Sequence, residues 1–220
     1  MTTTPAPWLS TARIALREFV PSDFDDLYRL DSDARVMRYL NGGQPLTHAE
    51  VRDALVRVLH GYPHYHGLGV WRAHHCPTGA FIGWFALKYC PPTCDVEVGY
   101  RLVPEFWNQG LATEGTRALL AHAFDALGLF RVIGITHPDN MASQRVLLKS
   151  GLVDEGWGHY YDRRVRLFAA ARAQPSGRRG HEAMVDSKRD LAIGAGADRR
   201  IRADGARPRP QSRMAHRTWR

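Results

Sequence analysis

The chain has 220 residues, of which 44% are hydrophobic, so it is long enough and apolar enough to bury a substantial core. Its net charge of +8 comes from one end, because residues 172–220 hold 13 basic and 5 acidic residues whereas residues 1–171 hold 17 of each. The charge therefore gives no reason to assign nucleic-acid binding to residues 1–171, and no stretch approaches the roughly 18 apolar residues that span a bilayer.

Helix-start signals divide the first third of the chain. Ser22 offers an N-cap hydroxyl, with Asp25 in place of the usual Glu of a capping box. Thr47 and Glu50 form a complete capping box, and Gly61 is a suitable stop. With the hydrophobic pattern, these signals predict a strand at Thr11–Phe19 and helices from Ser22 to about Leu30, at Ala34–Leu40 and from Thr47 to Gly61.

The next hundred residues combine strand-like runs with two helical ones. Three strands joined by short connections are typical of an antiparallel meander, and a long amphipathic helix ended by Gly128 follows. A strand, a helix stopped by Gly151 and a hairpin complete an α/β or α+β domain with a mixed sheet. The predicted strands are Gly69–Ala73, Ala80–Leu87, Asp95–Val103, Arg131–Thr136, Leu152–Tyr160 and Arg164–Ala170, and the predicted helices are Leu111–Leu127 and Asn140–Lys149.

The pattern ends at Gln174. From there on Gly, Pro, Ser and Arg dominate, and apolar residues such as Val185 and Ile193 stand alone. Such a segment buries too little apolar surface to offset the entropy of ordering it. We predict a folded domain at residues 1–173 and a basic, disordered tail at residues 174–220.

The number of cysteines and the first five residues bear on the cellular compartment of the protein. Three cysteines do not describe a disulfide framework. The segment from Met1 to Pro5 lacks the charged start and apolar core of a signal peptide. We expect a cytoplasmic protein without membrane contact, and the sequence makes no prediction of its oligomeric state.

The turn at residues 108–110 has the features of an anion site. A chain that enters a helix through Asn108, Gln109 and Gly110 presents unpaired backbone N–H groups at the positive end of the helix dipole. Such a terminus suits a pyrophosphate. Gly110 lets the backbone approach a ligand, and Ala112 keeps the first turn free of bulk. An ordinary capped connection has the same pattern, so the turn alone leaves both interpretations open.

Two blocks resemble the acetyl-CoA motifs of the GNAT superfamily of N-acetyltransferases. The first, residues 97–114, reads Glu-Val-Gly-Tyr-Arg-Leu-Val-Pro-Glu-Phe-Trp-Asn-Gln-Gly-Leu-Ala-Thr-Glu, and the second, residues 140–152, reads Asn-Met-Ala-Ser-Gln-Arg-Val-Leu-Leu-Lys-Ser-Gly-Leu. Both are most similar to the branch containing RimJ and RimL, the acetyltransferases of ribosomal-protein N-termini. The resemblance extends over residues 11–172. It implies a mixed, mostly antiparallel sheet that splays apart at the acetyl-CoA site and is flanked by helices.

The sequence departs from the usual motif at three positions. Trp107 stands where Gln or Arg is usual, Asn108 replaces Gly, and Leu152 replaces Phe. None of these changes removes a backbone N–H group that would hold a phosphate, so the pyrophosphate assignment is kept.

The resemblance also implies where acetyl-CoA would bind. The backbone of Leu102 and Val103 would hydrogen-bond the pantetheine arm as an added strand does. Asn140 would hydrogen-bond the pantetheine from the following helix, although Asn is also a common helix N-cap. The residues that would hold the pyrophosphate are Gln109, Gly110, Leu111, Ala112 and Thr113.

Two side chains are candidates for the proton transfers. An amine attacks a thioester only when it is neutral, so a base must take its proton, directly or through water. The resemblance places Glu97 in that role, the alternative being an exposed strand carboxylate. Ser143 lies one helical turn beyond Asn140 and corresponds to the proposed proton donor to the leaving thiolate, or to a hydrogen-bonding group for it. A backbone N–H of the splayed strand would polarise the thioester carbonyl.

Two other sets of residues are interpreted as structural. The spacing of the histidines and cysteines fits no closed Cys/His template, so we predict no metal site. Most of the aromatic residues between positions 62 and 89 are expected to pack in the core, although relatives use this region to shape the acceptor pocket. The first set is His60, His64, His66, His74, His75, Cys76, Cys90 and Cys94, and the second is Tyr62, Tyr65, Trp71, Trp84, Phe85 and Tyr89.

These observations predict an enzyme that moves an acetyl group from acetyl-CoA to a primary amine in a ternary complex. One alternative is a catalytically silent acyl-CoA-binding domain of the same fold. Another is a nucleic-acid-binding protein that acts through its tail, in which Trp219 is the one aromatic residue. A protein N-terminus, a polyamine, an amino acid or an aminoglycoside fits the visible residues equally well as the acceptor, and the tail could contact RNA or another acidic partner weakly.

Overall fold

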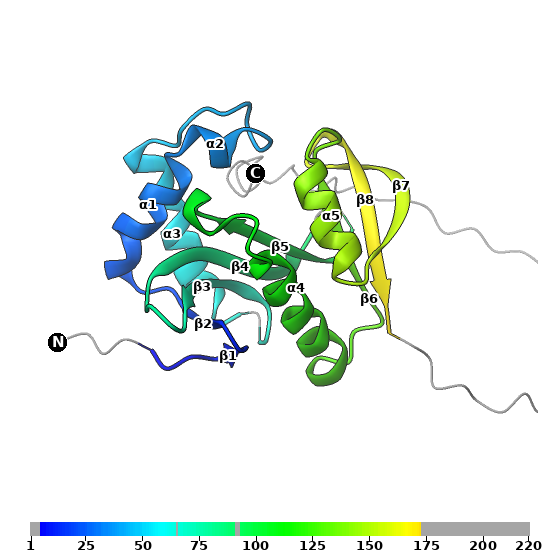
Figure 1. Ribbon diagram of the computed structural model, residues 1–220, viewed down its shortest axis with the longest axis horizontal. Helices are drawn as coiled ribbons and strands as arrows, with labels where there is room; N and C mark the ends of the chain where they lie inside the picture. Colours follow the sequence, from blue (N-terminus) through cyan, green and yellow to red (C-terminus); the bar gives the residue numbers. More distant parts are fainter. Residues whose placement is uncertain (1–4, 65, 91–92, 173–220) are drawn as a thin grey trace, which may run out of the picture. The chain divides into compact units, whose positions relative to one another are not determined.

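The computed structural model describes residues 5–64, 66–90 and 93–172, which form an eight-stranded sheet with helices on both faces (Figure 1). The strand order is β1-β2-β3-β4-β5-β6-β8-β7, and every neighbouring pair is antiparallel except the parallel pair β5–β6. The predicted mixed, mostly antiparallel sheet is confirmed, as are the meander and the terminal hairpin. No helix in the described residues is long and apolar enough to cross a membrane.

The elements follow the predicted order closely. The strands are β1 Leu9–Ser10, β2 Ile14–Glu18, β3 Gly69–His75, β4 Phe81–Tyr89, β5 Val96–Leu102, β6 Arg131–Thr136, β7 Val153–Tyr160 and β8 Arg163–Ala171. The α-helices are α1 Phe24–Asp31, α2 Ala34–Met37, α3 His48–Gly61, α4 Leu111–Ala121 and α5 Met141–Lys149, with 3₁₀ turns at Pro21–Asp23 and Pro104–Phe106 and a π-helical turn at His122–Ala126.

The helices form two layers, because alternate residues of a strand face opposite sides of a sheet. On one face, α1, α2 and α3 pack against β4 residues such as Trp84 and Ala86. On the other face, α4 packs against β4 and β5 residues such as Phe85 and Val98, and α5 packs against β6 and β7. Gly115 lets α4 lie directly on the sheet, since a Cβ there would be 2.3 Å from the Phe85 ring.

The two predicted helix caps have different outcomes. Thr47 Oγ1 accepts a hydrogen bond from Glu50 N at 3.3 Å, and a Glu50 carboxylate oxygen accepts one from Thr47 N at 2.8 Å, so this capping box is confirmed. The cap predicted at Ser22 is wrong. Ser22 lies within the 3₁₀ turn before α1, and Asp23 is instead paired with the buried Arg17 at 2.6 Å.

Several predicted boundaries also shift, and the helix expected at Ala34–Leu40 ends at Met37. The strand expected from Thr11 begins at Ile14, because Thr11 lies in the tight turn between β1 and β2, where its hydroxyl contacts the Ile14 carbonyl. The helix expected to reach Leu127 ends its α-helical part at Ala121 and continues as the π-helical turn. The tail predicted at residues 174–220 lies outside the described residues.

The feature that positions the candidate site is the contact between β5 and β6. Within the described residues these strands pair at one position, Glu97 with Ile133. Beyond it β5 stays paired with β4 as far as Leu102, whereas β6 pairs with β8 along its whole length. The sheet therefore opens between β5 and β6, as the resemblance implied.

Candidate functional site

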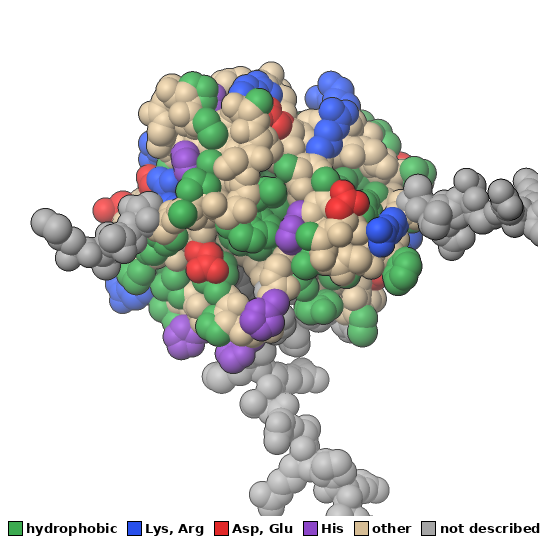
Figure 2. Space-filling view, turned by 90° about the horizontal axis from the view of Figure 1, so that it is seen from below, with side chains coloured by type: hydrophobic (Ala, Val, Ile, Leu, Met, Phe, Trp, Pro, Cys, Tyr) green, Lys and Arg blue, Asp and Glu red, His purple; other side chains and the backbone are tan. Residues whose placement is uncertain are grey.

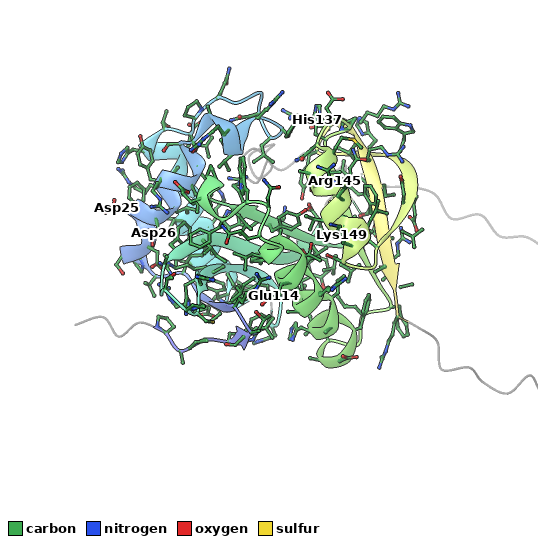
Figure 3. All side chains as sticks on the ribbon, in the orientation of Figure 1. Asp25, Asp26, Glu114, His137, Arg145 and Lys149 are labelled. Carbon is green, nitrogen blue, oxygen red and sulfur yellow. The ribbon has the colours of Figure 1, made fainter. Side chains whose placement is uncertain are left out.

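A cleft of about 710 Å³ lies at this opening. Its lining residues come from α2 and the residues after it, from β4 and β5, from the turn before α4, from the end of β6 and from α5. Figure 1 shows how these elements are arranged. Figure 3 shows His137 above α5, with Arg145 and Lys149 farther along that helix. All three residues line the cleft, and so do Glu97, Leu102, Gly110–Thr113, Asn140 and Ser143.

The pairing of β5 with β4 decides which backbone groups face the opening. Val103 N donates to Ile82 O at 3.0 Å, and these residues stand directly opposite in the register. Hydrogen-bonded and non-hydrogen-bonded pairs alternate along an antiparallel ladder. The backbone groups of Glu97, Gly99 and Arg101 therefore face β4, and those of Tyr100 and Leu102 face the opening.

This register bears on Val103, which the resemblance places at the pantetheine arm. Its N–H is bonded to Ile82, and its carbonyl accepts a hydrogen bond from Phe106 N at 3.1 Å, so neither group points into the opening. The Leu102 carbonyl accepts a hydrogen bond from the Trp107 indole at 2.7 Å. The backbone groups on β5 that suit an added strand are thus the N–H of Leu102 and both groups of Tyr100.

The turn before α4 has the geometry that its sequence predicts. Gly110 is the N-cap with φ of 79°, and within the described part of the chain no side chain caps this helix end. The first α4 N–H groups are therefore available to an anion. Asn108 also has a positive φ of 59°, a conformation that Asn tolerates better than most residues, which accounts for Asn at a position where Gly is usual.

A brace from the β1–β2 turn holds the first turn of α4. The Glu114 carboxylate accepts hydrogen bonds from the Thr11 hydroxyl at 2.6 Å and from Arg13 Nε at 2.7 Å, and Arg13 Nη1 donates to the Gln109 carbonyl at 2.9 Å. Burial acts to raise the pKa of Glu114, but these hydrogen bonds outweigh it and lower the pKa. The brace neutralises a carboxylate that would otherwise repel an anion at the helix end.

At the start of α5 the structure shows a network of three side chains. Asn140 is the N-cap, with its Oδ1 accepting from Ser143 N at 3.1 Å. The Ser143 hydroxyl lies 2.9 Å from the Tyr100 hydroxyl. Burial raises the pKa of Tyr100 to about 12, so the phenol keeps its proton at neutral pH. The structure therefore brings Tyr100 of β5 and the predicted Ser143 together beside the opening.

Glu97 lies on the opposite face of the sheet in a buried polar cluster. Its Oε2 accepts a hydrogen bond from the Tyr161 hydroxyl at 2.8 Å and lies 3.3 Å from Lys88 Nζ. Lys88 in turn donates to the Tyr161 oxygen at 2.7 Å. A Cβ at the neighbouring Gly99 would lie 3.9 Å from Glu97 Oε1. Because Gly99 has no side chain, this side of the carboxylate is not covered.

Tyr161 reaches Glu97 because of a tight turn. Tyr161 and Asp162 join β7 to β8 with φ of 52° and 58°, the geometry of a two-residue type I′ hairpin turn. Burial is the largest cause that raises the pKa of Tyr161, so its hydroxyl is a hydrogen-bond donor at neutral pH. The buried Cys90 lies nearby, and burial raises the pKa of its thiol to about 11, which makes it a poor nucleophile.

The histidine-rich segment lies apart from this site. His60, His64 and His66 are exposed, and Figure 2 shows histidine side chains at the surface of one face. In the residues that the structure describes, no three Cys, His or acidic side chains gather as a metal site would require. Trp71 and Phe85 are buried in the core, whereas Trp84 lines the cleft.

The comparisons with known proteins agree with this geometry. Residues 13–153, more than half of the chain, match the family model of the acetyltransferase (GNAT) domain. The chain belongs to the GNAT acetyltransferase family. The membership expected from the two sequence blocks is thus confirmed.

Relatives of this GNAT protein include enzymes and solved structures. FsC-acetyl coenzyme A-N(2)-transacetylase of Aspergillus fumigatus is 34% identical over 160 residues, which are 69% of this chain and 67% of that protein. YoaA of Bacillus subtilis, named an uncharacterized N-acetyltransferase, is 31% identical over 153 residues, 68% of this chain and 85% of that one. The ribosomal-protein acetyltransferase RimL, solved with coenzyme A, aligns with a TM-score of 0.62 and 19% identity over 73% of this chain and 95% of its own, which shows a shared fold.

Several residues of the candidate site were not predicted from the sequence. Tyr100 lies inside the first motif block, but its contact with Ser143 depends on how α5 packs. Lys88 and Tyr161 reach Glu97 from β4 and from a hairpin more than 60 positions away along the chain. The alternation along β4 could have placed Lys88 opposite Glu97, whereas no local signal marks Tyr161.

Proposed function

We propose that this GNAT protein transfers the acetyl group of acetyl-CoA to a primary amine by direct attack in a ternary complex. The observation that carries the proposal is the β5–β6 opening, which connects the free start of α4 on one face with Glu97 on the other. An acyl donor and an amine can then approach the same point from opposite faces. Bound acetyl-CoA supplies the acyl group as a reactive thioester.

The residues around the opening fit acetyl-CoA. The N–H groups from Gln109 to Thr113 would hold the pyrophosphate, because the uncapped helix end provides donors and a positive dipole. A surface cavity of about 670 Å³ beside this turn, lined by Arg13, Arg117 and Lys149 among others, would receive the adenosine end. Leu102 and Tyr100 would hydrogen-bond the pantetheine arm, and Asn140 would add its side-chain amide.

On the other face, Glu97 would accept the proton that the attacking amine must lose, directly or through a water molecule. Lys88 and Tyr161 fix its carboxylate by bonding to one oxygen. Ser143 would hydrogen-bond the sulfur that leaves, with Tyr100 orienting its hydroxyl. Both candidate catalytic side chains thus border the same cleft.

Finer assignments are part of the proposal. The RimJ/RimL branch is supported by the two sequence blocks, and an N(2) nitrogen is the acceptor named for the Aspergillus fumigatus relative. We retain residues 1–173 as the catalytic domain, with a cytoplasmic location. Residues 174–220 would attract an acidic partner such as RNA, and that contact would weaken as salt increases.

The test is release of coenzyme A thiol from acetyl-CoA with purified full-length protein and four amine classes: peptides with free N-termini, amino acids, polyamines and aminoglycosides. We expect saturable, amine-dependent release with at least one class. Binding of acetyl-CoA without release above the amine-free rate in every class would favour the catalytically silent alternative.

A further inference from the structure

The side of the cleft that faces the amine is rich in arginine and lysine. Its wall is formed by α2, the residues that follow it, and β4 and β5. Among the described residues that line the whole cleft, Glu97 is the one carboxylate. Four lysines and arginines of the cleft lie on this wall, Arg35, Arg38, Lys88 and Arg101, and two more, Arg145 and Lys149, line the cleft from α5.

Three of these six charges are already balanced by a carboxylate. Arg35 pairs with Asp33 at 2.6 Å, and Arg101 pairs with the buried Asp31 at 2.5 Å. Lys88 lies 3.3 Å from the Glu97 carboxylate, so the negative charge of Glu97 is itself offset. A second ammonium group on an acceptor would therefore find no unpaired carboxylate among the described cleft residues.

Arg38 differs from these residues. Its guanidinium lies 5.2 Å from the centre of the Tyr39 ring, and within the described ranges it forms no ion pair. Its side chain is exposed and lines the cleft. Tyr39 stands beside His137, with 5.5 Å between the ring centres, so Arg38 lies where the α2 side of the cleft meets the β6 side.

The phosphates of acetyl-CoA do not account for Arg38. The uncapped start of α4 lies in the layer of α4 and α5, together with Arg145 and Lys149 (Figure 3). Arg38 directly follows α2, which packs through Val36 in the other layer with α1 and α3. An unpaired guanidinium on the acceptor side suits a carboxylate or a phosphate on the acceptor itself.

We propose that the acceptor carries an anionic group, a carboxylate or a phosphate, beside its reactive amine, and that Arg38 binds this group. The inference rests on the proposed acetyl transfer and narrows its acceptor class. An amino acid or an amino phosphate satisfies it, whereas polyamines and aminoglycosides place additional positive charge against Arg38 and the already paired Glu97.

The test compares matched amines in the thiol-release assay with the full-length protein. One pair is alanine and alaninamide, and another is phosphoethanolamine and ethanolamine, with spermidine as the polycation. We expect the anionic member of each accepted pair to have a kcat/KM about tenfold higher, the effect of one charge pair at the rim of a cleft. If only the alanine pair is acetylated, the anionic group is a carboxylate, and if only the ethanolamine pair is acetylated, it is a phosphate.

Variants connect the preference to Arg38. Arg38→Gln should reduce the ratio of kcat/KM between the paired amines to within about twofold, and Arg38→Lys should keep part of the preference because it keeps the charge. Arg29→Gln, which changes an exposed arginine of α1 that does not line the cleft, is the matched control and should keep the whole ratio.

The outcomes separate the two proposals. If no amine of any class is acetylated, the proposed function fails. If amines are acetylated but the neutral or polycationic ones are used as well as the anionic ones, the anionic acceptor is wrong while acetyl transfer stands. If Arg38→Gln retains the preference, Arg38 is not the group that binds the anion.

Discussion

The start of α4 and the Glu97 cluster lie on opposite faces of the sheet and are built from different groups. The α4 site consists of backbone N–H donors arranged by Gly110 and Asn108, both with positive φ. The Glu97 cluster consists of three side chains brought together from β4, β5 and the β7–β8 turn. A site made from backbone depends on chain conformation and local charge, whereas a site made from side chains depends on each residue separately.

The largest effect on turnover should come from Glu97. Glu97→Gln keeps the shape of the side chain but cannot accept the amine proton, so we expect kcat to fall by roughly 10²–10³. The affinity for acetyl-CoA should stay within about threefold of wild type, because Glu97 lies on the acceptor face and not at the α4 turn. Steady-state kinetics from pH 6 to 8, with calorimetry of acetyl-CoA, test this. Wild-type turnover across that range would make Glu97 a structural carboxylate.

Gly110→Asp should lower the affinity for acetyl-CoA, whereas Glu97→Gln lowers turnover. A steric clash is not the cause, since a Cβ at Gly110 would lie 3.5 Å from Arg13 Nη2, an ordinary contact. The positive φ strains most side chains, and a carboxylate would oppose the pyrophosphate at the helix end. We expect the Kd for acetyl-CoA to rise by roughly 100-fold or more.

Gly110→Asn is the matched control, because Asn has the same shape as Asp without its charge and tolerates positive φ. It should raise the Kd by less than about tenfold. Equal affinity of wild type and a folded Gly110→Asp variant, measured by calorimetry, would remove the pyrophosphate assignment.

A smaller loss of turnover is expected from Tyr161, whose hydroxyl donates a hydrogen bond to Glu97. Tyr161→Phe removes the hydroxyl that donates to Glu97, so kcat should fall roughly tenfold with unchanged affinity for acetyl-CoA. In a Glu97→Gln background the same change should have almost no further effect, because the two residues act through one contact. Additive losses in the double variant would show that Tyr161 acts independently of Glu97.

The brace of α4 should contribute to stability with a defined pH dependence. Because the pKa of Glu114 is lowered in the folded protein, its ionised form stabilises the fold at neutral pH. This contribution is lost as pH falls below the usual range near 4.3 and through the lower folded pKa. We expect Glu114→Gln to reduce the free energy of unfolding by about 1–2 kcal/mol at pH 7.

Denaturant unfolding of wild type and Glu114→Gln at pH 7 and at acidic pH measures the difference. It should shrink as pH falls below about 4, where Glu114 becomes protonated in both folded and unfolded states. A difference that grows toward acid would contradict the assigned direction of the pKa change.

The smallest expected effect is that of removing the basic tail. A chain ending at Ala173 should keep the melting temperature, the affinity for acetyl-CoA and the turnover of a small amine, since every residue of both sites precedes it. Thermal melting and thiol release of full-length and shortened proteins compare these properties. A fall of several degrees, or a large loss of turnover, would place part of the tail inside the catalytic domain.

The same contrast explains how much the sequence could predict. The α4 turn is local in sequence, so Gly110, Asn108 and the helix that follows were enough to predict it. The meander, the terminal hairpin and the Thr47 capping box are also local patterns, and the structure confirms them. The cap expected at Ser22 failed because Asp23, the next residue, accepts the hydrogen bond from Val20 N and pairs with Arg17, so the chain forms a 3₁₀ turn there.

The acceptor side depends on contacts distant in sequence. The direction of the Val103 backbone groups follows from its register with Ile82, and neither residue alone reveals it. The positions of Tyr161 at Glu97 and of Arg38 at the cleft follow from how the hairpin and α2 pack. The sequence therefore predicted the proposed acyl-donor side in more detail than the side proposed to select the amine.

The most direct test of the central claim is a crystal structure of this protein with coenzyme A. We predict that the pyrophosphate oxygens lie within hydrogen-bonding distance of the backbone N–H groups of residues 111–113, and that the sulfur lies in the opening between β5 and β6 near Ser143. Coenzyme A bound with its pyrophosphate away from the start of α4, or with its sulfur outside the opening, would contradict the claim that the two faces of the sheet meet there for acetyl transfer.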